Sequence, residues 1–351
     1  MKHVIFLVHG MGDTVPGWSA PVQNLIRQKY QLYRVASRQK FDSHFVFKEI
    51  NYNHVFEAHI EKWKDNAASV TSVLEASGID DALLNRLMGM TRKTTRRDFA
   101  NTHVLDVILY RFMRGIKSQV ISHISDQLVG KLNEGDTVPP YSMICHSLGT
   151  AVMHDVMQAN LTTDHFPLST AHGLPKVYMT LANVSRVLED ADTHVYTSAV
   201  RPQLADRNKL YGCQRFINVA HTLDPFTRVR TFKPGWTKGA ANPLNNLKRD
   251  SYESLRIDGL TGVNPHDFEH YLENPQTHVA LFRGLLTQGS ITANELQAQS
   301  DQHHQLTLGG QFDLVKTAIR AIELQDDSSL DTAVGAWAEF QTLVRGLIAQ
   351  Q

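Results

Sequence analysis

MICHSLGTAV, residues 143–152, is the stretch that decides how this chain folds. Its apolar first half is typical of a buried strand, and a helical pattern begins at Leu148. Ser147 stands between the two, and Gly149 follows closely. A sharp strand-to-helix turn needs small neighbours, because the helix and the strand approach each other closely there. The stretch predicts either a nucleophilic serine at the tip of such a turn or a serine that only caps the helix.

The first small position of this turn departs from the usual G-x-S-x-G pattern, since Cys145 replaces the first glycine. A small residue other than glycine still fits that position. His146 belongs to the same turn, and we expect it to pack beneath the sheet rather than to act in catalysis. We keep the serine as a candidate nucleophile.

Strand-like and helical segments alternate on both sides of this stretch. Two of the helical patterns cover Trp18 to Tyr30 and Leu148 to Asn160. Strands that alternate with helices indicate a doubly wound, mostly parallel α/β sheet of about six strands. The expected strands are Val4 to Val8, residues 44–52, Tyr141 to Cys145, Lys176 to Val184, Arg215 to Ala220 and Tyr252 to Ile257.

Residues 54–135 interrupt the alternation and carry no strand signal. We predict that they form a helical cap insertion in an α/β domain that spans residues 1–288. A basic run, RKTTRR at 92–97, is interpreted as a solvated loop between helices. Apolar residues recur every four positions and predict one long amphipathic helix: Val104, Ile108, Phe112, Ile116, Val120, Ile124 and Leu128.

The sequence after residue 288 is expected to form a C-terminal helical extension, residues 289–351. Its first part is a polar stretch without a clear apolar pattern, and it contains QSDQHHQ. Two helical patterns then follow, over Phe312 to Leu324 and Leu330 to Ile348. We expect them to pack as a pair.

Composition limits the classes of partner. The chain has 351 residues, 42% of them hydrophobic, which is enough for a substantial core. Lys plus Arg and Asp plus Glu both number 35, so the global charge does not favour nucleic acid. Cys145 and Cys213 lie in apolar segments and are predicted to be buried thiols of a cytoplasmic protein. No stretch approaches the roughly 18 apolar residues of a membrane span, so we expect no stable membrane insertion.

A second motif ends the first expected strand. His9, Gly10, Met11 and Gly12 form a loop of the His-Gly type, in which glycines let the main chain approach a substrate carbonyl. Such a loop supplies one N–H to a developing oxyanion, and the residue after the nucleophile supplies the other. The expected donors are therefore the amides of Met11 and Leu148.

Together, LVHGMGD at 7–13 and CHSLGTAV at 145–152 resemble the α/β-hydrolases of the serine esterase and lipase group. The likeness covers roughly residues 1–50 and 139–288. It implies that Ser147 attacks an acyl carbon, that a histidine deprotonates the serine, and that an acid orients the histidine. It also implies the chain order Ser, Asp, His.

For the acid, the resemblance favours Asp224, which shortly follows the fifth expected strand and precedes Pro225. An aspartate before proline is also common in ordinary turns. Asp190 and Asp192, after the preceding strand, are the alternatives.

For the base, the segment 261–278 offers His266, His270 and His278. His278 falls inside the helix opened by Asn274-Pro275 and is expected to be structural. The family places its histidine in the loop before this helix. His266 is favoured narrowly over His270, and the sequence does not separate them.

No cofactor or metal is expected. The pairs His54 and His59, and His303 and His304, have no carboxylates at ligand spacing, and no HExxH motif occurs. No nucleotide-binding glycine motif follows a strand.

The resemblance thus implies a serine hydrolase that cleaves small-molecule acyl esters. A thioesterase or an acyltransferase would use the same residues. A non-catalytic binding or scaffold protein on the same fold is the alternative from another class.

Overall fold

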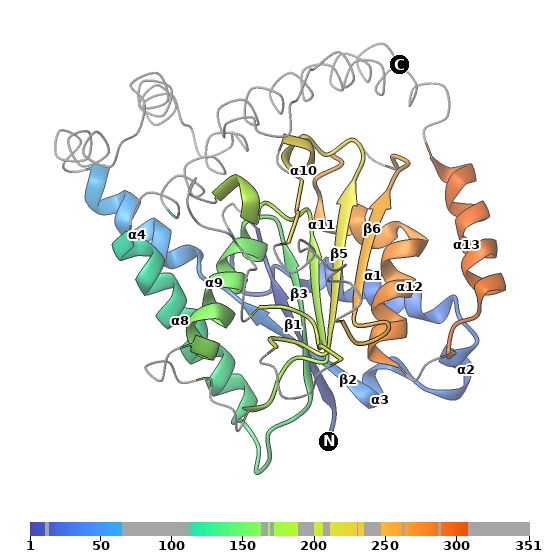
Figure 1. Ribbon diagram of the computed structural model, residues 1–351, viewed down its shortest axis with the longest axis horizontal. Helices are drawn as coiled ribbons and strands as arrows, with labels where there is room; N and C mark the ends of the chain where they lie inside the picture. Colours follow the sequence, from blue (N-terminus) through green and yellow to red (C-terminus); the bar gives the residue numbers. More distant parts are fainter. Residues whose placement is uncertain are drawn as a thin grey trace.

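Six parallel strands form the central sheet of the computed structural model (Figure 1). Their order is β2-β1-β3-β4-β5-β6. The predicted parallel α/β sheet is therefore confirmed. The strands are β1 (His3–Val8), β2 (Phe45–Ile50), β3 (Tyr141–His146), β4 (Val177–Leu181), β5 (Arg215–His221) and β6 (Tyr252–Ile257).

The structure describes the sheet, the helices around it and most of the loops that join them. The described residues are 1–10, 14–64, 110, 114–162, 168, 172–188, 200–205, 211–229, 231–234, 247–261, 264–286 and 289–307.

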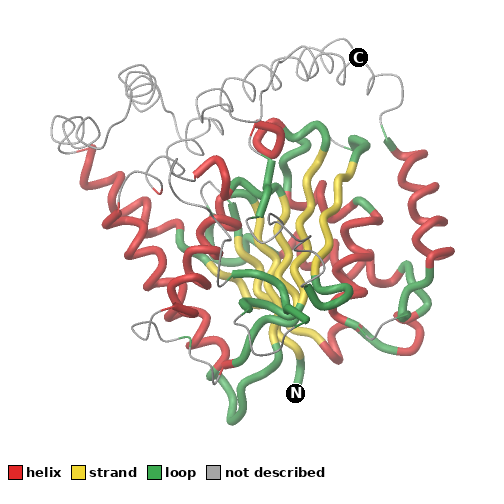
Figure 2. Tube along the Cα trace, in the orientation of Figure 1, coloured by secondary structure: helices red, strands yellow, loops and turns green. Residues whose placement is uncertain are grey.

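Helices cover both faces of the sheet, as Figure 2 shows. Along β1, Val4, Phe6 and Val8 point into one apolar core, and Ile5 and Leu7 point into the other. This alternation explains why the strands are apolar throughout. The first core is covered by α4 (Asn53–Lys64), α8 (Arg114–Leu132) and α9 (Leu148–Thr162), and the second by α1 (Ala20–Gln31), α11 (Phe268–Glu273) and α12 (Pro275–Leu285).

The other described elements are short or peripheral. They are α2 (Val35–Arg38), α3 (Phe41–His44), a 3₁₀ helix over Ser185–Leu188, α10 (Pro225–Val229) and α13 (Ala293–Leu306).

The described end of the predicted insertion packs against the sheet. Ile116, Val120, Ile124 and Leu128, which the four-residue periodicity selected, are all buried in the core between α8 and the sheet. Helix α8 therefore serves as the crossover between β2 and β3. The first part of the expected cap is α4, whose Val55 and Phe56 lie in the same core. The other residues of the four-residue pattern and the RKTTRR run lie outside the described residues, so the cap stays a prediction.

The polar stretch after residue 288 is a helix, which the composition did not indicate. Helix α13 contains QSDQHHQ and begins with a capping box, in which Thr292 and Glu295 each bond the other's backbone N–H. That local signal outweighs the polar composition. The two helical patterns expected further on lie outside the described residues.

Both cysteines are free and buried, as predicted. In the described part of the chain, no helix is at once long and apolar enough to cross a bilayer. The cytoplasmic location stays a prediction.

The sheet order determines where loops from different parts of the chain meet. Strand β1 has β2 on one side and β3 on the other, so the connections leaving β1 and β3 diverge. At such a point a crevice opens beyond the carboxyl ends of the strands. His9 and Gly10 follow β1 there, and Ser147 follows β3.

We predict that Ile124→Ala lowers the free energy of unfolding by about 3 kcal/mol, because it leaves a cavity between α8 and the sheet. Denaturation in urea measures the change. Ser122→Ala, on the exposed face of the same helix, is the control and should alter stability by less than about 0.5 kcal/mol. Equal effects of the two substitutions would contradict the packing described here.

Candidate active site

Ser147 occupies a strained corner between β3 and α9. Its φ is 51°, in the left-handed region that non-glycine residues rarely adopt. The corner is fixed on both sides. The Ser147 N–H donates to Leu181 O on β4 at 3.0 Å, and Thr150 Oγ1 donates to Ser147 O at 2.6 Å.

Close backbone contact explains the glycines around this corner. A Cβ on Gly149 would lie 2.2 Å from His9 O, and a Cβ on Gly10 would lie 2.7 Å from Ser147 Cβ. The side chain of Cys145 instead lies in the core beneath α8 and α9. Glycine is thus required at 149 and at 10 but not at 145, which accounts for the departure from the usual pattern. The contact of Gly10 with the serine was not foreseen.

A continuous hydrogen-bonded chain joins Ser147, His266 and Asp224. His266 Nε2 lies 2.7 Å from Ser147 Oγ, and His266 Nδ1 lies 2.8 Å from Asp224 Oδ2. Because a carboxylate can only accept, Nδ1 carries the proton of the neutral ring, and Nε2 accepts from the serine hydroxyl. The structure therefore brings together three of the residues that the sequence singled out.

Asp224 is fully buried and keeps its charge through its donors. His266 and the Tyr271 hydroxyl both donate to Oδ2, the latter at 2.7 Å, and the Phe226 N–H donates to Oδ1 at 3.0 Å. Burial alone would raise the pKa of Asp224, but the adjacent His266 and these hydrogen bonds outweigh it and lower the pKa below its ordinary value. The group is a carboxylate at neutral pH.

The other candidate histidines lie elsewhere. His270 is buried on α11, with its Nε2 3.4 Å from His221 Nε2 and its Nδ1 3.3 Å from Thr261 Oγ1. His278 lies in α12 and bonds Tyr33 Oη at 2.6 Å, in keeping with a structural role. The alternative acids at 190 and 192 lie outside the described residues.

His146 borders the site, contrary to the expectation that it packs beneath the sheet. Its Nε2 donates to His266 O at 2.6 Å, and its ring stacks on Phe268 with 4.9 Å between centroids. It thereby holds the main chain of His266 in place. Nothing in the local sequence signalled this contact, because the partners are far apart along the chain.

The loop after β1 is held by Tyr52 and by the ring of His9. Tyr52 Oη lies 2.8 Å from His9 O and 3.0 Å from Gly10 O, so its one proton is shared between them. His9 Nδ1 donates to Gly10 O at 2.7 Å, and Nε2 accepts from Thr14 Oγ1 at 3.0 Å. Burial lowers the pKa of His9 to about 4, so the ring is neutral at neutral pH.

Of the two expected oxyanion donors, the structure describes only Leu148. Met11 lies outside the described residues. Leu148 is the first residue of α9, and the first N–H groups of a helix have no acceptor within it. The amide of Leu148 is thus free of the helix's own ladder, at the end where the helix dipole is positive.

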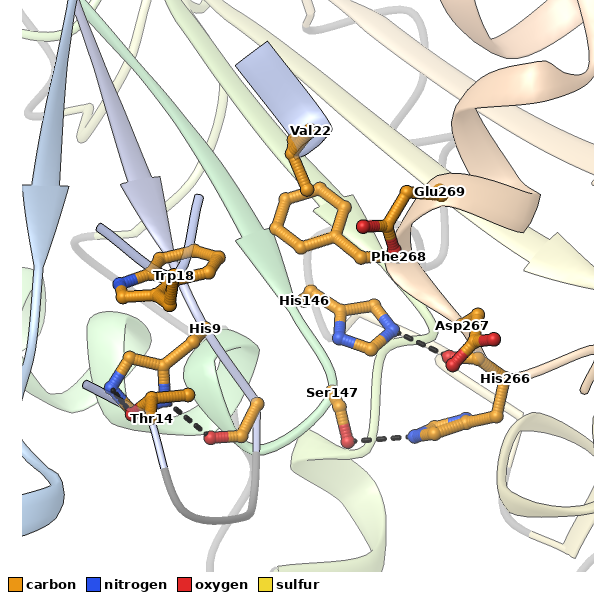
Figure 3. A pocket seen from close by; sticks show the side chains of 11 residues that line it. His9, Thr14, Trp18, Val22, His146, Ser147, His266, Asp267, Phe268 and Glu269 are labelled. Atoms are coloured by element: carbon orange, nitrogen blue, oxygen red, sulfur yellow. Dashed lines mark hydrogen bonds between the residues drawn. The ribbon is translucent and has the colours of Figure 1, made fainter. Parts of the chain in front are cut away.

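A pocket of about 160 Å³ opens over Ser147 (Figure 3). Its walls come from the loop after β1, the start of α1, the corner itself and the segment 266–269. Trp18, Val22 and Phe268 supply apolar surface, and Asp267 and Glu269 add two carboxylates. The pocket can hold an apolar group next to the serine.

Metal binding finds no support in the described residues, where no three His, Cys, Asp or Glu side chains are grouped as ligands. His54 packs edge-on against His123, and His59 bonds Gln119 at 3.0 Å.

Comparison of the chain with protein-family models, with curated proteins and with solved structures gave no match.

We predict that Gly149→Ala destabilises the fold by about 3 kcal/mol or more, because the new methyl group would overlap the His9 carbonyl. Thermal and urea unfolding measure this effect. Gly130→Ala is the control, since it lies on α8 with nothing near its added Cβ and should stabilise the helix by about 0.5 to 1 kcal/mol. If Gly149→Ala left the free energy of unfolding unchanged, the two backbones would not be in contact.

Proposed function

We propose that this protein is a serine hydrolase of the α/β-hydrolase type that cleaves carboxylic esters through an acyl-enzyme on Ser147. The observation that carries the proposal is the unbroken Ser147–His266–Asp224 chain beside a left-handed serine. The chain order Ser, Asp, His and the position of the serine at the switch point of a parallel sheet support it.

In the first half-reaction, Ser147 Oγ attacks the acyl carbon while its proton passes to His266 Nε2. Asp224, which accepts from Nδ1, stabilises the imidazolium that forms. His266 then protonates the departing alkoxide, and the alcohol leaves. A water molecule, deprotonated by the same nitrogen, attacks the acyl carbon. The bond from that carbon to Ser147 Oγ then breaks, His266 Nε2 returns the proton to Ser147 Oγ, and the acid leaves.

Negative charge develops on the carbonyl oxygen in both half-reactions. The N–H of Leu148, at the positive end of the α9 dipole, is one donor to that oxygen. The amide of Met11 is the second donor that the family resemblance implies. Loss of one such donor typically costs about 3 to 4 kcal/mol of transition-state stabilisation.

The pocket indicates which ester suits the site. Trp18, Val22 and Phe268 favour an apolar group beside the serine. Asp267 and Glu269 line the same pocket, and the lining residues that the structure describes include no lysine or arginine. We therefore propose neutral or cationic esters as substrates, because an anionic one would meet like charges.

Two other classes use this geometry. A thioesterase or an acyltransferase would form the same acyl-enzyme, and product analysis separates them: a hydrolase releases free acid, whereas a transferase passes the acyl group to an added alcohol. A scaffold protein would form no acyl-enzyme.

The first test is covalent labelling by a fluorophosphonate probe, located by peptide mass spectrometry. We predict that the probe modifies Ser147 and that Ser147→Ala abolishes the labelling.

Asp224→Asn should lower kcat on p-nitrophenyl esters by roughly 10⁴-fold, because the asparagine would favour the wrong histidine tautomer.

His270→Gln serves as the control for the choice of base. It should keep most of the activity, because His270 contacts His221 and Thr261 rather than Ser147. Absence of labelling in folded wild-type protein would exclude the hydrolase and favour the scaffold.

A second test concerns charge selectivity. Glu269→Gln should raise kcat/KM for the p-nitrophenyl monoester of succinate by about threefold relative to p-nitrophenyl butyrate, because one repulsive carboxylate is removed. The ratio of the two kcat/KM values is measured at low ionic strength. Asp126→Asn, an exposed change on α8, should leave the ratio unchanged. An unchanged ratio in Glu269→Gln would remove this argument for substrate charge.

A further inference from the structure

The hydroxyl of Tyr271 makes two hydrogen bonds at the centre of the site. It donates to Asp224 Oδ2 at 2.7 Å and accepts from the His221 N–H at 3.1 Å. The tyrosine has no solvent exposure. The carboxylate oxygen that it contacts is the one that receives His266 Nδ1 at 2.8 Å. Two donors therefore share one oxygen atom.

The position of Tyr271 in the fold makes this contact a bridge. Tyr271 lies on α11, the helix that begins just after His266, whereas His221 ends β5 and closely precedes Asp224. The hydroxyl thus ties the helix that follows the base to the strand that carries the acid. Without it, Asp224 Oδ2 would keep only the His266 bond among the contacts that the structure describes.

We infer that Tyr271 is a positioning residue of the proposed hydrolase: it fixes the rotation of the Asp224 carboxylate and limits how strongly that carboxylate holds the proton of His266. The inference rests on the proposed function. Loss of the hydroxyl leaves the negative charge less compensated, so the carboxylate retains a proton on the imidazole more firmly. The base is then free to accept the serine proton only at higher pH.

The surrounding charges do not supply the same effect. The titratable groups that act on Asp224 are His266, Tyr271 and His221, with His270 behind His221. Burial lowers the pKa of His221 to about 4 and also lowers that of His270, so both rings are neutral near neutral pH. The carboxylate of Asp267, next to His266, also interacts with that imidazole, and Tyr271→Phe leaves it in place. A change in the pH profile of a Tyr271 variant therefore reports on the pair of Asp224 and His266.

The chain contains a matched control for this test. Tyr33 is also buried, and its hydroxyl also makes a short hydrogen bond, to His278 Nε2 at 2.6 Å. That bond joins the segment after α1 to α12 and does not involve Asp224. Tyr33→Phe and Tyr271→Phe each remove one buried hydroxyl and keep the ring.

The experiment compares full-length wild type, Tyr271→Phe and Tyr33→Phe by kcat and KM against pH with p-nitrophenyl butyrate. For Tyr271→Phe we expect kcat to fall about tenfold, KM to stay within about twofold, and the acid limb to move up by on the order of half a pH unit. Tyr33→Phe should lower the unfolding temperature similarly but leave all three values unchanged. In histidine-labelled protein, the resonance of the His266 Nδ1 proton should shift or broaden in Tyr271→Phe only.

The outcomes separate this inference from the proposed function. Identical kinetics, pH profile and His266 resonance in the two variants would overturn the role of Tyr271. A changed resonance with unchanged kinetics would also overturn it, because the contact would then not serve the reaction. If wild type neither hydrolyses esters nor reacts with fluorophosphonate, the proposed function fails, and the resonance alone decides whether Tyr271 positions the Asp224 and His266 pair.

Discussion

The close approach of two backbones is the constraint on which the site depends. The first turn of α9 lies against the His9 carbonyl so tightly that position 149 has no room for a side chain. Gly10 likewise has no room for a side chain, because Ser147 Cβ lies beside it. With the helix held there, the chain can leave β3 only by a sharp corner, and Ser147 takes a left-handed φ. The strained corner places its hydroxyl toward His266.

Burial of charge is the second constraint, and the site meets it with hydrogen bonds. Asp224 is withdrawn from water, which is costly for an unpaired carboxylate. Its three donors offset that cost and keep it ionised. The neighbouring His221 is neutral at neutral pH, because burial lowers its pKa to about 4. The charge of Asp224 therefore acts mainly on the adjacent His266, with little screening by solvent.

The sequence was sufficient for features that are local along the chain. Apolar runs predicted the strands. The serine corner and the His-Gly loop predicted one half of the candidate site, and the proline after Asp224 indicated the turn in which this aspartate lies. The choice between His266 and His270 was beyond local patterns, because it depends on where α11 begins and which way it faces. Tyr271 and His146 were missed for the same reason: their partners are 47 and 120 residues away. The capping box of α13 is a local signal, but it was overlooked because the segment that follows it is polar.

The two halves of the site are held together in different ways. Ser147 and the loop after β1 are joined through main-chain contacts, which tolerate no added atoms. Asp224 and His266 are joined to their surroundings through side chains, by the Tyr271 hydroxyl and the His146 ring. A change in the first half must displace backbone and so acts on the fold itself. A change in the second half removes a hydrogen bond without adding atoms, so it can leave the fold intact and alter only how Asp224 and His266 are oriented. The main chain therefore fixes the position of Ser147, and the side chains fix the orientation of Asp224 and His266 toward it.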